Sequence, residues 1–341
     1  MIVEKLYLQW VFSLWSCFQS TCRQLNETKL LILLKLSFKK LLILIVVFKE
    51  TISLIYLQTF MNKTILVLTD FSENSWTAIT YASYLAKEFN WRVQLLHTYS
   101  STIKDNINIQ LENPAFISQK ERAESLLEEW RTRLDNAFPN LGCEMLCLPG
   151  DLIKTVLDLL PQQEYTFIVM GAKGKGMIKK AFLGSNTFAL IKKSPIGVLA
   201  IPITCTKFQL LNVGLLSNFK ESEYDLLGSF TNRLSTNFKL SLLHVTQKYI
   251  SPKQEDVEEW KQKLSSKFSF DQIDYLEKNA VNRLDYNMPI PRCIEYMVEQ
   301  GGIDLLLVSY SPKSFFKSLF SRNLTKAIYR NLAVPTFFKS S

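Results

Sequence analysis

The sequence predicts an α/β protein made of two tandem, open, five-stranded parallel sheets. Three observations lead to this class. Short apolar runs alternate with longer amphipathic segments, which is typical of strands joined by covering helices. The order of these segments repeats once along the chain. The chain also has 341 residues, of which 47% are hydrophobic, enough for two domains with cores of their own.

The first half supplies the strands and helices of one sheet in order. Residues 65–68 form a continuous apolar run, as expected for a strand buried on both faces. Residues 72–89 carry apolar side chains at helical spacing, so we expect a helix there. The remaining predicted elements are a strand over 93–96, a helix over 114–138, a strand over 143–148, a helix ending at 160, a strand over 167–170, a helix after a glycine-rich loop, and a strand over 196–201.

The second half repeats two of these strands. The letters QLLHT at 94–98 are matched by SLLHV at 241–245, and FIVM at 167–170 is matched by LLLV at 305–308. The two spacings are 147 and 138 residues, which indicates two similar domains rather than a solenoid. We therefore expect three parts, namely an N-terminal extension over 1–60, a first domain over 61–204 and a second domain over 205–341.

Residues 1–60 differ in composition from the rest of the chain. They contain no Gly, Ala, Pro, Asp or His, and their uncharged run at 41–48 is far shorter than the roughly 20 residues of a membrane span. Translation of an AT-rich upstream region would give this bias, so we expect Met61 to be the true start. An amphipathic membrane-surface segment and a true span are the alternatives. Membrane contact is expected only if 1–60 are part of the protein.

Charge and cysteine usage exclude several classes of function. The 281 residues after position 60 carry a net charge of +5 of the total +9, and no nucleic-acid-binding signature is visible. We therefore expect no nucleic-acid partner. Six cysteines without a Cys-x-x-Cys pair, together with only two histidines, make a zinc site hard to assemble. A reducing, cytoplasmic location follows from the same cysteine usage.

The loop after the fourth strand has the pattern of a phosphate site. Residues 170–187 read MGAKGKGMIKKAFLGSNT, with Gly171, Gly174 and Gly184 at spacings that let backbone N–H groups approach a ligand. Gly184-Ser185 opens a predicted helix, whose N-terminus favours an anion. Ser185 and Thr187 can add hydroxyl donors, and four lysines make the loop basic. The loop also lies at the carboxyl end of a strand, where open α/β sheets bind ligands.

This glycine spacing resembles the ATP-binding signature of the universal stress protein family. The opening ILVLTDFS at 65–72, the LH pair at 96–97, Gly150 after the third strand and the SP pair at 194–195 are also similar to that family. The resemblance covers 61–202 strongly and 208–340 weakly. It implies Rossmann-like domains of the adenine nucleotide alpha hydrolase type.

The resemblance also implies a cofactor and the residues that hold it. The cofactor would be ATP with Mg²⁺ on its phosphates, and no protein ligand for the metal can be named. Asp70 would bind near the adenosine, and Thr98 stands where the family usually has a hydrophobic contact. The residues implied to line the nucleotide or hold its phosphates are Met170, Gly171, Gly174, Gly184, Ser185 and Thr187.

The second half departs from this pattern. At the spacing of 138, Ser309, Pro312 and Arg322 stand in place of the three loop glycines. Near the position that corresponds to Asp70 stands Asn218, whose side chain has no carboxylate. This half is expected to have lost ATP and to pair with the first half. In the family, subunits pair through their last strands, here 198–202 and 336–338, and a homodimer of the whole chain stays open.

Three hypotheses for the function follow from these features. The first is a universal stress protein-like, ATP-binding regulator in the cytoplasm, with an unidentified protein partner and at most slow ATP hydrolysis, since no general base is positioned. The second is an ATP-cleaving or adenylylating enzyme of a related fold. The third is a nucleotide-free scaffold, in which the glycine loop is only a tight connection, Asp70 only a helix cap and the lysines a solvated face. His97 and His244 are interpreted as packing residues at strand ends.

Overall fold

The computed structural model describes residues 63–99, 114–172, 183–205, 208–231, 234, 238–246, 251–280, 288–310 and 334–340. All of them belong to the compact unit Met61–Ser341. In this part of the chain no helix is long and apolar enough to cross a membrane. The expectations for residues 1–60 lie outside the described residues.

The first half alternates strictly between strands and helices. Its elements are β1 (Thr64–Leu68), α3 (Glu73–Phe89), β2 (Arg92–Tyr99), α5 (Pro114–Ala137), β3 (Cys143–Pro149), α6 (Leu152–Leu159), β4 (Tyr165–Gly171), α7 (Ser185–Lys193) and β5 (Val198–Ile201). The five strands run parallel in the order β3-β2-β1-β4-β5.

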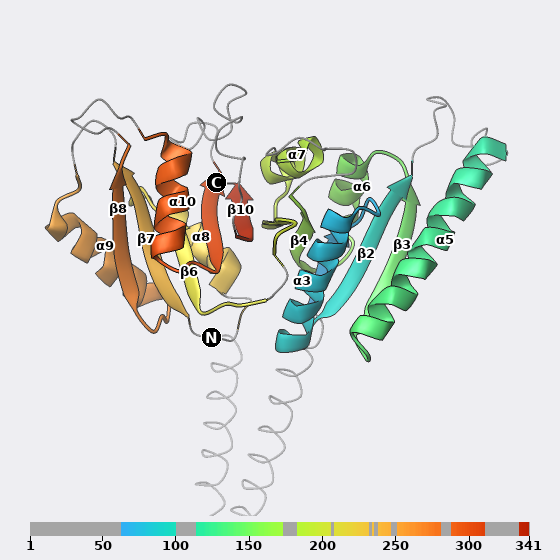
Figure 1. The fold of residues 1–341 in the computed structure, drawn as a ribbon, viewed down its shortest axis with the longest axis horizontal. Helices are drawn as coiled ribbons and strands as arrows, with labels where there is room; N and C mark the ends of the chain where they lie inside the picture. Colours follow the sequence, from blue (N-terminus) through green and yellow to red (C-terminus); the bar gives the residue numbers. More distant parts are fainter. Residues whose placement is uncertain are drawn as a thin grey trace, which may run out of the picture. The chain divides into compact units, whose positions relative to one another are not determined.

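The second half repeats the arrangement. Its elements are β6 (Asn212–Leu216), α8 (Ser222–Thr231), β7 (Lys239–Thr246), α9 (Gln254–Lys267), β8 (Ile273–Asn279), α10 (Ile290–Gln300), β9 (Leu305–Tyr310) and β10 (Thr336–Ser340). These strands are also parallel, in the mirrored order β10-β9-β6-β7-β8. The predicted α/β class with parallel, crossover-connected strands is confirmed (Figure 1).

The two sets of strands join into one ten-stranded sheet. β5 and β10 pair antiparallel, with Leu199 opposite Phe337, Ala200 opposite Thr336 and Val198 opposite Phe338. Leu199 follows Val169 across the first half, and Phe337 follows Leu307 across the second. The central pair is therefore formed by equivalent positions, and the halves are related by a local two-fold axis through it. The expected pairing through the last strands is thus present within one chain.

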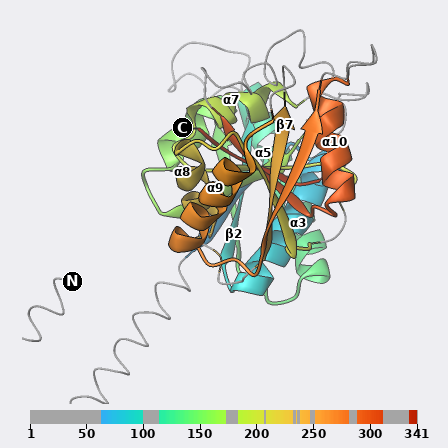
Figure 2. The same ribbon diagram turned by 90° about the vertical axis from the view of Figure 1, so that its left-hand side faces the viewer.

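Alternate strand residues build two cores, one on each face of the sheet. One face packs against α3, α5, α8 and α9, and its core includes Val67, Val169 and Leu307. The other face packs against α6, α7 and α10, and its core includes Leu66, Ile168 and Leu306. Figure 2 shows α8 and α9 on one side of the second half's strands and α10 on the other. Burial on both faces explains why the strands are continuous apolar runs.

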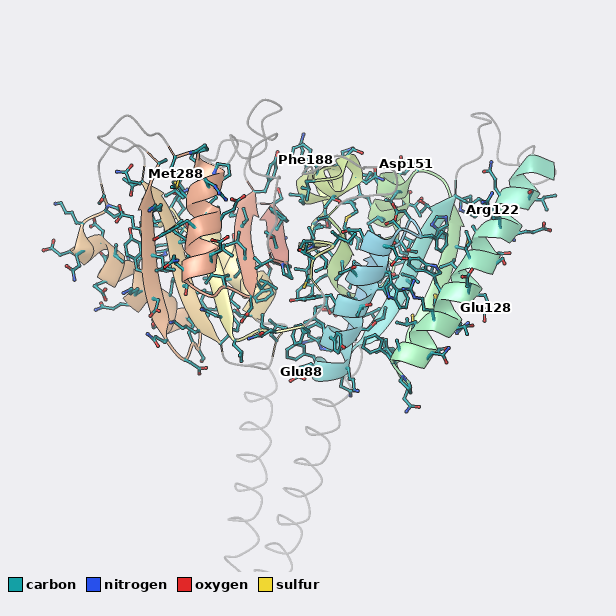
Figure 3. All side chains as sticks on the ribbon, in the orientation of Figure 1. Glu88, Arg122, Glu128, Asp151, Phe188 and Met288 are labelled. Atoms are coloured by element: carbon teal, nitrogen blue, oxygen red, sulfur yellow. The ribbon has the colours of Figure 1, made fainter. Side chains whose placement is uncertain are left out.

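Side chains cross between the two halves on both faces. The Phe337 ring lies against Phe167 and Phe230, with ring centroids 5.2 Å away in each case. A Cβ atom at Gly197 would lie 1.9 Å from the Phe337 ring, so the glycine leaves room for that ring. On the other face, Phe188 of α7, labelled in Figure 3, contacts Tyr310 at the end of β9. Their ring centroids are 6.2 Å apart.

Candidate functional site

The candidate residues of the first half gather where its chain connections diverge. Within the sheet, β2 is the neighbour of β1 on one side and β4 is its neighbour on the other. The chain leaves β1 toward β2 and returns later to form β4. Ligands of open α/β sheets bind outside the carboxyl ends of the strands at such a switch point. Asp70 follows β1 by two residues, and Gly171 is the last residue of β4. Because Leu68 pairs with Met170, these two strands end side by side.

Asp70 sits in a tight turn between β1 and α3. Its Oδ1 accepts hydrogen bonds from the Ser72 amide at 3.1 Å and from the Ser72 hydroxyl at 2.6 Å. Ser72 in turn caps α3, because its Oγ accepts from the Ser75 amide at 3.2 Å. The carboxylate is partly exposed, so it is oriented by the turn while still reaching the surface. Its helix-capping neighbourhood and a binding role are therefore compatible.

Gly171 contacts the first turns of two helices, α3 and α7. A Cβ atom there would lie 2.0 Å from Nδ2 of Asn74, a buried residue in the first turn of α3. The Asn74 side chain donates to the carbonyl of Ile201 at 3.5 Å. The Thr187 hydroxyl donates to the carbonyl of Gly171 at 3.3 Å. These contacts bring the start of α3, the ends of β4 and β5, and the start of α7 to one place.

The first turn of α7 has backbone donors with no side-chain cap. Gly184 is its N-cap residue and makes no side-chain cap hydrogen bond. The other two helices of the first half with a described cap are closed by side chains, α3 by Ser72 and α6 by Asp151, whereas α9 and α10 of the second half also start without a side-chain cap. The Gly184 amide donates to the carbonyl of Ala172 at 2.8 Å, so the two ends of the glycine loop meet. Ser185 is exposed, whereas Thr187 is buried with its hydroxyl directed to Gly171.

The remaining predicted residues have different surroundings. Thr98 lies inside β2, not after it as expected, since this strand continues to Tyr99; it pairs with Leu148 and is partly exposed. Met170 is 7% exposed and packs in the core beneath α6 and α7. Gly174 and the lysines of the loop lie outside the described residues. Of the predicted residues, Asp70, Gly171, Gly184 and Ser185 thus lie at the carboxyl ends of β1 and β4 and at the adjoining start of α7.

Two further residues at these turns were not found from the sequence. Asn74 fills the space beside Gly171, but an asparagine in a helical first turn gives no signal of a contact across the sheet. In the second half the buried carboxylate of Glu223 occupies the turn after β6. It accepts from the Ser217 hydroxyl at 2.6 Å and from the amides of Asn218 at 2.7 Å and Lys220 at 3.2 Å.

The environment of Glu223 perturbs its acidity. Burial raises its pKa above the usual value, although the hydrogen bonds from Ser217, Asn218 and Lys220 oppose this effect. The adjacent strand-end residue Ser309 occupies the position of Gly171, since Val308 corresponds to Met170 in the strand register. Pro312 and Arg322 lie outside the described residues. The described part of this second turn therefore presents a buried carboxylate and a side chain where the first half has hydroxyls and a glycine.

Comparisons with known proteins agree with these observations. Residues 61–202 match the model of the universal stress protein family. A universal stress protein from Archaeoglobus fulgidus DSM 4304 superimposes with a TM-score of 0.62 at 18% identity, covering 82% of this chain and 99% of that one. A Pseudomonas aeruginosa UCBPP-PA14 protein assigned to the universal stress proteins gives 0.50 at 12% identity, covering 82% and 93%. At these identities the two structures show a shared fold spanning both halves. No curated protein matches the chain.

Proposed function

Because residues 61–202 match the model of the universal stress protein family, we propose that the chain is an ATP-binding regulator with one nucleotide site, in its first half. Asp70 contacts the adenosine, while Thr98, Met170 and Gly171 line the nucleotide. The phosphates are held by the glycine loop and by the start of α7, through Gly174, Gly184, Ser185 and Thr187.

One observation carries the proposal, namely the uncapped N-terminus of α7 beside a glycine-ended strand at the switch point of the sheet. Backbone amides without a side-chain cap at a helix start favour a phosphate electrostatically. The exposed Ser185 hydroxyl adds a donor there. The Thr187 hydroxyl supports the site indirectly, because its hydrogen bond to the Gly171 carbonyl fixes the strand end against the helix.

The proposal includes Mg²⁺ bound to the nucleotide phosphates, where it would neutralise their charge. It assigns the metal no protein ligand, and the described residues contain no group of three or more His, Cys, Asp or Glu that could hold an ion. Asp70, whose carboxylate is engaged by Ser72, is assigned to binding and not to proton transfer. The proposed activity is therefore sensing of ATP, with at most slow hydrolysis, in the cytoplasm.

The second half does not bind nucleotide in this proposal. The Glu223 carboxylate already takes the amides of Asn218 and Lys220, and Asn218 stands in place of the Asp70 carboxylate at this turn. Ser309 adds a side chain where the first half has none. ATP then shifts the protein toward the one of its two conformations that it binds more tightly. A partner protein yet to be identified responds to that shift.

The test is calorimetric titration of Mg-ATP into the full chain. We expect one site per chain that is lost in Gly174→Asp, because a carboxylate in the loop repels the phosphates, and weakened in Asp70→Ala. Asn218→Ala is the matched control at the second turn and should bind as the wild type does. No heat at about 1 mM nucleotide from a folded protein would contradict the proposal and favour a nucleotide-free scaffold.

A further inference from the structure

His97, at the carboxyl end of β2, contacts the residues on both sides of Asp70. Its Nδ1 lies 2.9 Å from the carbonyl oxygen of Thr69. Because a carbonyl only accepts, Nδ1 carries the proton and donates it. The same imidazole ring lies against the Phe71 ring, with centroids 4.3 Å apart and planes inclined by 40°. One side chain thus holds the residue before Asp70 by a hydrogen bond and the residue after it by ring contact.

Phe71 has a backbone conformation that aromatic residues rarely adopt. Its φ is 59°, in the left-handed region, where a bulky side chain is strained. This conformation reverses the chain so that the Ser72 amide faces the Asp70 carboxylate. The turn is closed further by the Phe71 amide, which donates to the Thr69 hydroxyl at 3.1 Å. The orientation of Asp70 therefore depends on a strained residue that must be held by its side chain.

Aromatic packing supplies that support. The Phe71 ring also meets Trp130 of α5 edge-on, with centroids 5.4 Å apart. Trp130 in turn meets Trp76 of α3 edge-on at 5.4 Å, and the Arg133 guanidinium lies 3.8 Å from the centroid of Trp76. Edge-on aromatic pairs and stacked cations are attractive beyond the area that they bury. The Phe71 ring is thus fixed between a hydrogen-bonded histidine and a tryptophan of α5.

The second half repeats this support around a turn in which Asn218 stands in place of Asp70. Phe219 has a φ of 57°, and His244 Nδ1 lies 3.0 Å from the carbonyl of Ser217. The rings of Phe219 and His244 have centroids 5.2 Å apart, and Trp260 meets Phe219 edge-on at 6.4 Å. Among the described non-glycine residues with positive φ, these two phenylalanines are the aromatic ones, and they hold equivalent positions. The second turn is therefore a matched control within the same chain.

We propose that Phe71 and His97 are positioning residues that brace Asp70 for the nucleotide. The brace acts through Asp70 and needs no contact with the ligand. This inference rests on the proposed function for its ligand, but the geometry of the brace exists without nucleotide. Its effect can therefore be measured both on ATP affinity and on the turn itself.

The experiment compares Phe71→Gly with Phe219→Gly in the full chain. Glycine keeps the left-handed conformation without strain and removes the whole side chain, ring included, and the added backbone freedom is the same in both variants. Freeing one ordered side chain weakens binding by up to about ten-fold, and we expect a loss of this size for Mg-ATP in Phe71→Gly. Phe71→Tyr keeps the ring and should restore wild-type affinity. Phe219→Gly should leave the affinity for Mg-ATP unchanged. The two glycine variants should lower the melting temperature by similar amounts.

A second measurement, hydrogen exchange of the amides in the Asp70 turn, needs no ligand. We expect faster exchange at Ser72 in Phe71→Gly and unchanged exchange there in Phe219→Gly. Wild-type ATP affinity together with unchanged exchange in Phe71→Gly would overturn the brace, as would equal losses of affinity in both glycine variants. If the wild type binds no ATP, the proposed function fails and the exchange result alone decides the inference.

Discussion

At the scale of single residues, the clearest difference between the halves is an exchange of size beside the strand end. In the first half, Gly171 leaves a space that the buried Asn74 fills. In the second half, the register places Ser309 at the glycine position, and Ser222 begins α8 as Asn74 lies in the first turn of α3. The first half thus combines a large side chain, Asn74, with a glycine, whereas the second half has two small serine side chains at these positions.

This exchange predicts the effect of a single substitution. Gly171→Ser should lower the free energy of unfolding by about 1–3 kcal/mol, because its Cβ would overlap the Asn74 side chain. Adding Asn74→Ser should recover much of that loss. The measurement is denaturant unfolding of both single variants and the double variant. Gly142→Ala is the control, since its Cβ would meet only Arg92 at 3.6 Å. Additive losses in the double variant would show that the two positions do not compete for space.

The sequence places candidate residues at element ends that the fold brings together. Gly171 and Gly184 were named from their spacing in the loop and Asp70 from the family resemblance, and β1 and β4 end side by side; their binding roles stay predictions. Asn74 was missed because its contact crosses 97 positions of sequence to Gly171. Phe71 was missed because nothing in its type announces a positive φ. Contacts of this kind depend on the tertiary fold and leave no local pattern.

At the scale of elements, α3 and α8 begin by different means. The start of α3 is satisfied by hydroxyls, with Ser72 and Ser75 bonded to each other's backbone amides. The turn before α8 uses the carboxylate of Glu223 instead, at 2% exposure. The two solutions differ in charge, because the second one buries a titratable carboxylate where the start of α3 has hydroxyls.

Glu223 gives a prediction about that pH dependence. Its pKa is raised by burial in the folded state, so the folded chain holds more protons than the unfolded chain above the usual value of 4.5. The contribution of Glu223 to stability should therefore be fully present below pH 4.5 and be lost as pH rises through its raised folded-state pKa. Glu223→Gln should flatten the dependence, measured as melting temperature from pH 4 upward. Glu88→Gln, at an exposed position on α3 (Figure 3), should leave it unchanged. A wild-type profile that rises over the same window would contradict the assignment.

Element boundaries show what periodicity can and cannot give. The helix expected over 72–89 is found at Glu73–Phe89 with Ser72 as its cap, because capping chemistry is visible in sequence. The strand expected over 93–96 extends over Arg92–Tyr99, so Thr98 lies within it. His97 and Thr98 are polar and partly exposed, and only pairing with β3 keeps them extended. Strand ends at a ligand-facing edge are therefore the part that apolar patterns underestimate.

At the scale of the whole molecule, the two halves share one core on the face of α3 and α8. That cluster runs from Val67 in the first half to Leu307 in the second. Phe337 has no exposed surface and lies between Phe167 of β4 and Phe230 of α8. Because the sheet is also continuous through β5 and β10, the halves have no independent boundary at this face.

This continuity predicts one cooperative unfolding transition for both halves. Phe337→Ala should lower stability by about 3–5 kcal/mol and still leave a single transition. The measurement combines calorimetry with circular dichroism, whose midpoints should coincide. Leu211→Ala, at a residue that is 67% exposed, should change stability by less than about 0.5 kcal/mol. Two separated transitions, with only one shifted by Phe337→Ala, would show that the halves unfold independently.

The antiparallel junction has a consequence for how such a protein can change over generations. When two identical chains meet at a two-fold axis, the residue on the axis must face its own copy. Here Leu199 faces Phe337, and Gly197 accommodates a ring that has no symmetric counterpart. Tethering also fixes the local concentration of one half around the other, so pairing does not depend on how much protein a cell makes. Each half can therefore change at this junction without requiring the same change in an identical copy of itself.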